Sequence, residues 1–378
     1  MPIIVGGRVN GTAGLYNIGL LNIQTDGKEE ADAVKTNFTV LRVKRSILRR
    51  SNIGLLVTSR SPTAAGTDSN LAVGAEANFA FFRSITFSTY YARTRGGDQP
   101  EGSDESSYRA RFEYSSDRHG LVGEHLLVGD AFNPEVGFVR RSDFRRSAVT
   151  ARFSPRPASS RFVRRHVWQG GYEYVTDGRA TRVENRGATG LWRIELTNSD
   201  MWSVDYAHDY EFLPDDFEIS PGIVIPTRGY SYQTLSTGYT MGQQRRVSGR
   251  ITVRAGTFYE GTKQEMTLTA GRMALSARLN VEPGITLNWV DLPQGRFDTR
   301  LFTARVIFTP SPRSLVSGLF QLNPIDETLS SSVRLRWEYT GGSEIFVVYT
   351  DNRNIEAGAA STLMNRSFAV KITRLVRF

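Results

Sequence analysis

Hydrophobic and polar residues alternate with a period of two along most of this chain. The clearest examples are residues 108–114, 202–212, 247–255 and 333–339, where β-branched and aromatic residues alternate with charged or hydroxyl-bearing ones. Successive side chains of a β-strand point to opposite faces, so this period predicts strands with one apolar and one polar face. No segment shows the i, i+3, i+4, i+7 apolar stripe of an amphipathic helix. The pattern predicts an all-β protein.

The connections between the predicted strands alternate in length. Short connections lie near residues 83–84, 117–119, 155–161, 198–200, 242–245, 275–278, 309–313 and 340–343. The connections between them are often longer and richer in Gly, Pro and acidic residues, and they include residues 25–35, 61–69, 95–107, 129–146, 213–228, 291–296 and 352–365. Short periplasmic turns and longer outer loops are typical of an up-and-down transmembrane β-barrel. Ten outer connections after Gly14 predict an antiparallel barrel of about 20 strands, in the range 18–22.

The last predicted strand covers residues 368–378 and ends on an aromatic residue. Its apolar face carries Phe368, Val370, Ile372, Val376 and Phe378. A final strand of this kind is typical of barrels in the bacterial outer membrane, where the terminal aromatic residue lies at the membrane interface. We expect these five residues to form an insertion signal that the barrel-assembly machinery binds.

One domain is predicted over residues 14–378, the barrel itself. Residues 1–13 predict an additional strand that runs in the inward direction and has no partner from within the chain. The first residues, MPIIVGGR, lack the basic and apolar regions of a signal peptide. We therefore expect that a longer parent sequence precedes Met1 and that residues 1–13 are a partial strand of it.

Composition narrows the functional classes. Hydrophobic residues make up 39% of the 378 residues, and no run of 18 apolar residues is present, which excludes a conventional transmembrane helix. The net charge is +9, but the arginines recur along predicted strands instead of clustering on one segment, which argues against nucleic-acid binding. Cysteine is absent, and the four histidines are dispersed. We predict no catalytic site, no metal and no cofactor.

The polar faces of the predicted strands are dense in both charge signs. The candidate lumen-lining residues are Arg109, Arg111, Glu113, Asp205, Asp209, Glu211, Arg250, Arg254, Arg334, Arg336, Glu338 and Lys371. Burying such a face in a soluble propeller would cost desolvation free energy, whereas in a wide barrel this face lines a water-filled lumen and stays hydrated. The arginines and Lys371 would bias the lumen toward anionic solutes. Alternatively, Glu113, Asp205 and Glu338 pair with the arginines across strands and fill the interior.

Several segments resemble a known family. They are PIIVGGRVNG (residues 2–11), YNIGLLNIQT (16–25), FNPEVGFVRRSDF (132–144), NWVDLPQG (288–295) and LNPIDE (322–327). Each is similar to segments of bacterial outer-membrane proteins in which a carbohydrate-binding family 9-like domain precedes an uncharacterised barrel. The resemblance covers essentially the whole chain and implies that it is the barrel portion, in the outer membrane of a Gram-negative cell.

The leading functional prediction is a non-enzymatic outer-membrane barrel for the passage or binding of a solute. An anionic solute follows from the lumen arginines, whereas a glycan follows only from the family resemblance. The expected partners are outer-membrane lipid, the barrel-assembly machinery and this solute. Two alternatives stay open: a barrel hydrolase that uses carboxylates such as Asp205, Asp209 and Glu211 at the outer rim, and a structural anchor for a sugar-binding-type domain. A soluble β architecture is the alternative fold.

Overall fold

The computed structural model describes residues 2–28, 33–62, 68–97, 99–355 and 361–376, and all of its regular elements are strands. The described residues contain no helix long and apolar enough to cross a membrane. The first twelve strands are β1 (Ile3–Ala13), β2 (Tyr16–Thr25), β3 (Thr36–Ile47), β4 (Ser51–Pro62), β5 (Asn70–Phe81), β6 (Ile85–Arg95), β7 (Ser106–Ser115), β8 (His119–Val128), β9 (Phe144–Phe153), β10 (Val163–Thr176), β11 (Val183–Leu196) and β12 (Met201–Phe212).

The other strands are β13 (Phe217–Ser220), β14 (Ile223–Ile225), β15 (Gly229–Thr240), β16 (Val247–Phe258), β17 (Gly261–Ala274), β18 (Leu279–Leu292), β19 (Gly295–Ser311), β20 (Ser314–Asn323), β21 (Thr328–Thr340), β22 (Ser343–Asn354) and β23 (Thr362–Thr373). Two compact units divide the chain. The first comprises Met1–Ser154, Gln169–Thr189 and Asp209–Phe212, and the second comprises Pro155–Trp168, Gly190–His208 and Leu213–Phe378.

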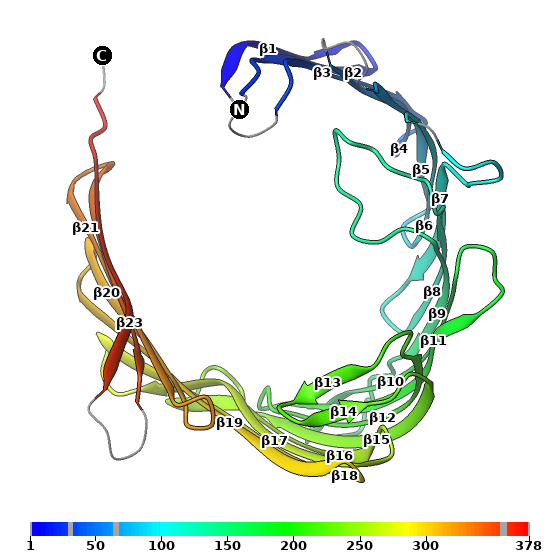
Figure 1. Ribbon diagram of the computed structural model, residues 1–378. Coiled ribbons are helices and arrows are strands. Elements are labelled where there is room, and N and C mark those ends of the chain that lie inside the picture. The colour runs from blue at the N-terminus through cyan, green and yellow to red at the C-terminus, as the bar shows by residue number, and fades with distance from the viewer. Residues whose placement is uncertain (1, 29–32, 63–67, 98, 356–360, 377–378) are drawn as a thin grey trace. The chain divides into compact units, whose positions relative to one another are not determined.

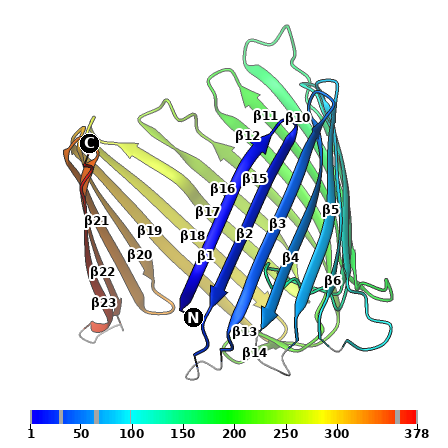
Figure 2. The same cartoon turned by 90° about the horizontal axis from the view of Figure 1, so that it is seen from above.

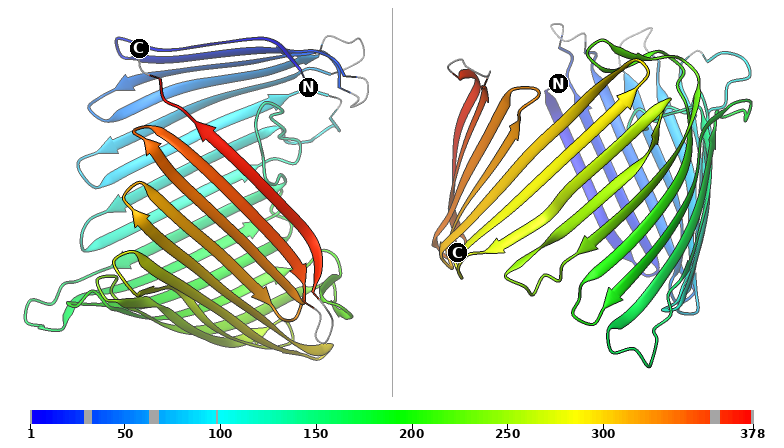
Figure 3. Two further views of the ribbon diagram at one scale, coloured as in Figure 1. Left: turned by 90° about the vertical axis from the view of Figure 1, so that its left-hand side faces the viewer. Right: turned by 90° about the horizontal axis from the view of Figure 1, so that it is seen from below.

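Strands that follow one another in the chain pair antiparallel within each unit. In the first unit this holds from β1 to β9, and Figure 2 shows β1 to β6 side by side. In the second unit it holds from β15 to β23, whose last strands are orange to red in Figure 3. One sheet contains 21 strands, and β13 and β14 form a separate pair. The chain has the all-β, up-and-down antiparallel fold of a transmembrane barrel, as predicted.

The strand at the start of the chain has a partner. β1 pairs with β2 from Ile3 opposite Thr25 to Ala13 opposite Tyr16, so the prediction of an unpartnered strand is wrong. The two strands are joined by a tight turn in which Gly14 has a φ of 59°, a backbone conformation that glycine adopts without strain. This turn was not among the connections predicted from the sequence, and it brings the two strands together.

The connections keep the predicted asymmetry with exceptions. We call the loop end the end where β2 joins β3 in the first unit and, separately, the end where β22 joins β23 in the second; the connections after β8 and β12 are long. The predicted long connection at residues 291–296 is instead a tight hairpin, because β18 continues to Leu292 and β19 begins at Gly295. At the opposite end, here called the turn end, β9 and β10 are joined by a connection longer than a tight turn.

The register separates two faces in each unit. We call the face that carries Arg109 in the first unit and Arg254 in the second the inner face, and the opposite one the outer face. Large apolar side chains on the outer face are exposed in mid-strand, including Leu55 (57%), Val253 (47%) and Phe368 (68%). Exposing so much continuous apolar surface to water is unfavourable, so this face is suited to contact with lipid.

Part of the predicted terminal face is present. Phe368, Val370 and Ile372 lie on the outer face of β23 and are exposed, and Val376 is exposed beyond the end of that strand. Phe378 lies outside the described residues. The apolar stripe is therefore described from Phe368 to Val376, and its role as an insertion signal stays a prediction.

Aromatic side chains gather on the outer face near the turn end of the second unit. The His166 ring stacks on Trp168 at a centroid distance of 5.2 Å, and Trp192 meets Trp202 edge-on at 5.4 Å. The Trp202 indole also donates a hydrogen bond to the Thr237 hydroxyl over 2.9 Å. Aromatic girdles at the level of the membrane interface are typical of transmembrane barrels.

Candidate functional site

Of the twelve charged residues predicted for the lumen, the nine on β7, β16, β21 and β23 lie on the inner face. In the first unit, three arginines converge on the carboxylate of Glu124 on β8. Arg109 Nε lies 3.0 Å from it, a guanidinium nitrogen of Arg111 lies 3.3 Å from it, and one of Arg146 on β9 lies 2.7 Å from it. Arg111 also contacts Glu113 of its own strand at 3.0 Å. Three guanidinium groups therefore surround a carboxylate that sequence reasoning missed, because Glu124 reaches them only through cross-strand register.

The predicted acids make local contacts. Asp205 accepts a hydrogen bond from the Ser203 hydroxyl over 3.2 Å, and Glu338 accepts one from the Gly342 amide over 2.9 Å. Asp209 lies against Gly187 of β11, where an added Cβ would come within 2.6 Å of its carboxylate. Glu211 belongs to the same short piece of β12 in the first unit. Of the acids expected to pair across strands, Glu113 and Glu338 instead bond within their own strand or turn.

The long segment between β8 and β9, residues 129–143, is held against the inner face of the first unit. The Asn70 amide donates to the Asn133 carbonyl over 2.9 Å and accepts from the Glu135 amide over 3.2 Å. Thr94 Oγ1 accepts a hydrogen bond from the Asn133 amide over 3.1 Å, and Arg60 pairs with Glu135 at 2.6 Å. Figure 1 shows this segment on the concave side of β4 to β7. The segment contains all but the last residue of the FNPEVGFVRRSDF motif, which is therefore an inward-folded, docked loop.

The docking residues are themselves buried at the ends of their strands. Asn70 is 4% exposed and Thr94 is 2% exposed, whereas Phe138 in the middle of the segment is 88% exposed. A buried amide that satisfies both a donor and an acceptor of a loop backbone fixes that loop at two points. The segment is therefore fixed at Asn133 and Glu135, while Phe138 stays exposed.

Replacing Asn70 should loosen this segment. We expect Asn70→Ala to raise the rate of tryptic cleavage at Arg140 and Arg141 about tenfold, because two net hydrogen bonds of about 0.5–1.5 kcal/mol each are lost. The matched control is Asn78→Ala, since Asn78 lies on the same face of β5 but bonds to Asn52 of the neighbouring strand β4 and not to the docked segment. Limited proteolysis of the folded protein in detergent measures the rates. Equal rates in both variants would contradict the docking role.

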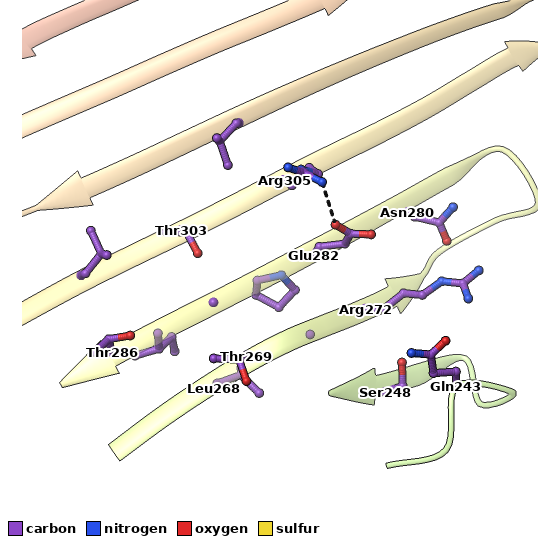
Figure 4. Close-up of a pocket in the computed structure, with 16 residues that line it drawn as sticks. Gln243, Ser248, Leu268, Thr269, Arg272, Asn280, Glu282, Thr286, Thr303 and Arg305 are labelled. Atoms are coloured by element: carbon purple, nitrogen blue, oxygen red, sulfur yellow. Dashed lines mark ion pairs between the residues drawn. The ribbon is translucent and has the colours of Figure 1, made fainter. Parts of the chain in front are cut away.

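A cavity of about 680 Å³ lies on the inner face of β16 to β20 in the second unit (Figure 4). Its charged lining groups are Arg272, Glu282 and Arg305, and Arg305 lies 4.0 Å from Glu282. Hydroxyl and amide groups complete the polar lining, namely Ser248, Thr269, Thr286, Thr303, Asn280 and Gln243. The side-chain Oδ1 of Asn280 is buried without a hydrogen-bond partner among the described residues. The cavity thus combines positive charge with groups that bind hydroxyls.

A break in the strand ladder creates this cavity. The register of β17 against β18 is interrupted between Leu268 and Met273. Pro283, on the other side of the break, has no amide hydrogen to donate. Gly271 is required there, because a Cβ on it would lie 2.4 Å from the Pro283 carbonyl oxygen. Bulges of this kind re-aim side chains and recur next to binding sites.

The hairpin of β13 and β14 packs on the inner face at the loop end of the second unit. Ile225 and Tyr230 are buried against Val290 and Leu292 of β18, all at 5% exposure or less. The NWVDLPQG motif supplies Val290 and Leu292, so this motif also has a docking role. The cluster is the hydrophobic core of the described part of the second unit.

The inner face of β15 to β23 carries excess positive charge. Its cationic residues are Arg250, Arg254, Lys263, Arg272, Arg305, Arg334, Arg336 and Lys371, and its acidic residues are Glu265, Glu282, Glu338 and Glu344. Within the described residues, Arg250, Arg272, Arg334 and Lys371 have no carboxylate partner. By contrast, Arg336 bonds to Glu344 over 3.0 Å. The face therefore attracts anions.

Of the cavity's charged groups, sequence reasoning found none. Arg272, Glu282 and Arg305 lie on strands whose alternation is interrupted or weak, and only pairing brings them together. No cluster of three or more His, Asp or Glu residues in the described ranges is arranged to hold a metal ion.

Comparisons with known proteins find similarity at the level of the fold. The sequence matches no protein-family model and no curated protein. Among solved structures, the chain is similar to the crystal structure of the ferric-catecholate import receptor Fiu from E. coli K12 in its open form. The two share 10% sequence identity with a TM-score of 0.43, over 93% of this chain and 78% of that chain. The resemblance to the carbohydrate-binding family 9-like proteins stays a prediction.

Proposed function

We propose that the chain is an outer-membrane β-barrel that binds and passes a solute, and that the solute is anionic. The observation that carries this proposal is the division of the strands into an exposed apolar outer face and a charged inner face with excess arginine. A lipid phase accommodates the first face, and an aqueous path accommodates the second.

The cavity at Arg272 and Arg305 is the proposed binding site on this path. Two guanidinium groups with one carboxylate leave a net positive charge, which favours a carboxylate, sulfate or phosphate group. The surrounding hydroxyls favour a polyhydroxylated body. A charged glycan combines both features, and its assignment rests on the family resemblance together with this lining.

Planar-bilayer recording tests the proposal. We expect the refolded chain to give unitary currents with a preference for chloride over potassium, and Arg272→Ala with Arg305→Ala to reduce that preference several-fold. Arg300→Ala is the matched control, because Arg300 lies on the outer face of the same strand as Arg305. An acidic oligosaccharide should block the current at lower concentration than its neutral counterpart.

Two outcomes would overturn parts of the proposal. A folded, inserted chain that carries no current would contradict passage and favour the structural anchor. An unchanged ion preference in the Arg272/Arg305 variant would contradict the role of the cavity while leaving passage intact.

A further inference from the structure

The outer face of β22 and β23 changes character along its length. Going from the loop end, the register places Asp351 opposite Arg366, Tyr349 opposite Phe368, and Val347 opposite Val370. Ile345 opposite Ile372 continues the apolar part toward the turn end. One pair of strands therefore presents charged groups at the loop end, then two aromatic rings, then aliphatic side chains.

The charged end is built around one carboxylate. The Asp351 side chain is 10% exposed and accepts hydrogen bonds from Arg366 Nε and Nη2 over 2.9 and 2.8 Å. Arg353 Nε donates to its other oxygen over 2.6 Å, and the Tyr349 hydroxyl donates over 3.1 Å. Two guanidinium groups share this carboxylate, so the cluster keeps one net positive charge. Both arginines are fixed in place yet remain 39% and 47% exposed.

Other arginines on the outer face of the second unit are paired differently. Arg296 pairs with Asp291 and Arg300 with Asp298, each at 2.7 Å. Each of these pairs is electrically neutral, so neither leaves charge for an anion. The excess at Arg353 and Arg366 therefore distinguishes the β22–β23 face.

An amphiphile with an anionic head and acyl chains matches this order of groups. Guanidinium groups bind phosphate through paired, charge-assisted hydrogen bonds, and Phe368, Val370 and Ile372 are exposed directly beneath them on the same face. In a transmembrane barrel the loop end faces the cell exterior, so the lipid is one of the outer leaflet. In Gram-negative bacteria that leaflet is built of phosphorylated glycolipid.

We propose that the outer face of β22 and β23 binds a phosphorylated glycolipid of the outer leaflet. Arg353 and Arg366 bind its phosphate, Asp351 positions both guanidinium groups, and an acyl chain lies along Phe368, Val370 and Ile372. This site rests on the proposed function, because it requires the outer face to lie in the outer membrane.

Native mass spectrometry of the refolded chain in detergent, titrated with lipid A, tests the site. We expect Arg353→Gln with Arg366→Gln to weaken lipid A binding about tenfold or more, because both phosphate-binding groups are lost. Arg296→Gln with Arg300→Gln is the matched control and should leave binding unchanged. Equal weakening in both double variants, or in neither, would overturn the site.

Two further arms identify the ligand and separate this proposal from the previous one. Phosphatidylglycerol should bind more weakly than lipid A, and equal binding would overturn the assignment to a glycolipid. Insertion of the wild-type chain into phosphatidylcholine vesicles is scored separately. A chain that inserts but shows no lipid A site overturns only this inference, whereas a chain that inserts into no bilayer overturns the proposed function.

Discussion

Arginine in place of Leu55 is expected to destabilise the membrane-inserted fold strongly, whereas arginine in place of its neighbour Leu56 is tolerated. Leu55 lies on the outer face in the middle of β4, between Val43 and Ala75. An arginine at the bilayer midplane of a barrel costs about 2–4 kcal/mol on the lipid face. Leu56 lies on the inner face beside Gly74, near the ion pair of Arg42 with Glu76. There a charged side chain stays in water.

The two positions form a matched pair, since the same residue type is replaced by the same residue one step along one strand. Urea unfolding in phosphatidylcholine vesicles, followed by tryptophan fluorescence, gives both free energies of unfolding. We expect the Leu55→Arg variant to lose at least about 2 kcal/mol more than the Leu56→Arg variant. Equal losses would contradict the assignment of the two faces.

Replacing Asp200 is expected to give the largest loss of stability among turn residues. Asp200 precedes β12 at the turn end and is fully buried. Its carboxylate accepts hydrogen bonds from the Tyr239 hydroxyl over 2.6 Å, the Gly242 amide over 2.7 Å and Arg245 over 2.5 Å. Asn198 adds a fourth bond over 3.0 Å. One carboxylate thus ties the β11–β12 turn to the connection between β15 and β16.

Asp200→Ala should lower the free energy of unfolding by about 3 kcal/mol, because it leaves the guanidinium of Arg245 and a backbone amide without their partner. Asp200→Asn keeps the shape but not the charge, and we expect it to lose less. The control is Asp216→Asn in the exposed loop, where the carboxylate accepts hydrogen bonds from Thr227 alone among the described residues. A loss of stability at Asp200 no greater than that at Asp216 would contradict the role of Asp200 in joining the two connections.

The same carboxylate predicts a pH dependence. The hydrogen bond from Tyr239, followed by the Gly242 amide and the charge of Arg245, lowers the pKa of Asp200 below its ordinary value of 3.8. A carboxyl whose pKa is lowered by folding stabilises the fold above its ordinary pKa, and this stabilisation is lost as the pH falls through the lower value. We therefore expect wild type to lose stability below about pH 4 more steeply than Asp200→Asn, measured by urea unfolding across that range.

The sequence predicted the parts of the fold that local periodicity determines. In β7, Arg109 and Arg111 alternate with Tyr108 and Phe112, and this period alone assigns the strand and its two faces. The number of strands followed because each turn leaves its own Gly, Pro or polar signal. These features need no knowledge of which strand lies beside which.

The site needed that knowledge. Glu124 is the partner of three arginines on β7 and β9, and the cavity at Arg272 exists because β17 and β18 lose register near Pro283. The docking of residues 129–143 depends on Asn70, which lies far from them in the chain. Cross-strand register and loop docking are tertiary properties, so periodicity could not reveal them.

Cysteine scanning along β16 tests the central claim, that the apolar outer face lies in lipid and the charged inner face in water. The chain has no cysteine, so each variant from Arg250→Cys to Ala255→Cys carries one label and no background. With a fluorophore on each cysteine in vesicles, lipid-borne quenchers should act at 251, 253 and 255, and aqueous iodide at 250, 252 and 254. Quenching without this alternation, or a chain that stays monodisperse in water without detergent, would contradict the membrane-barrel account.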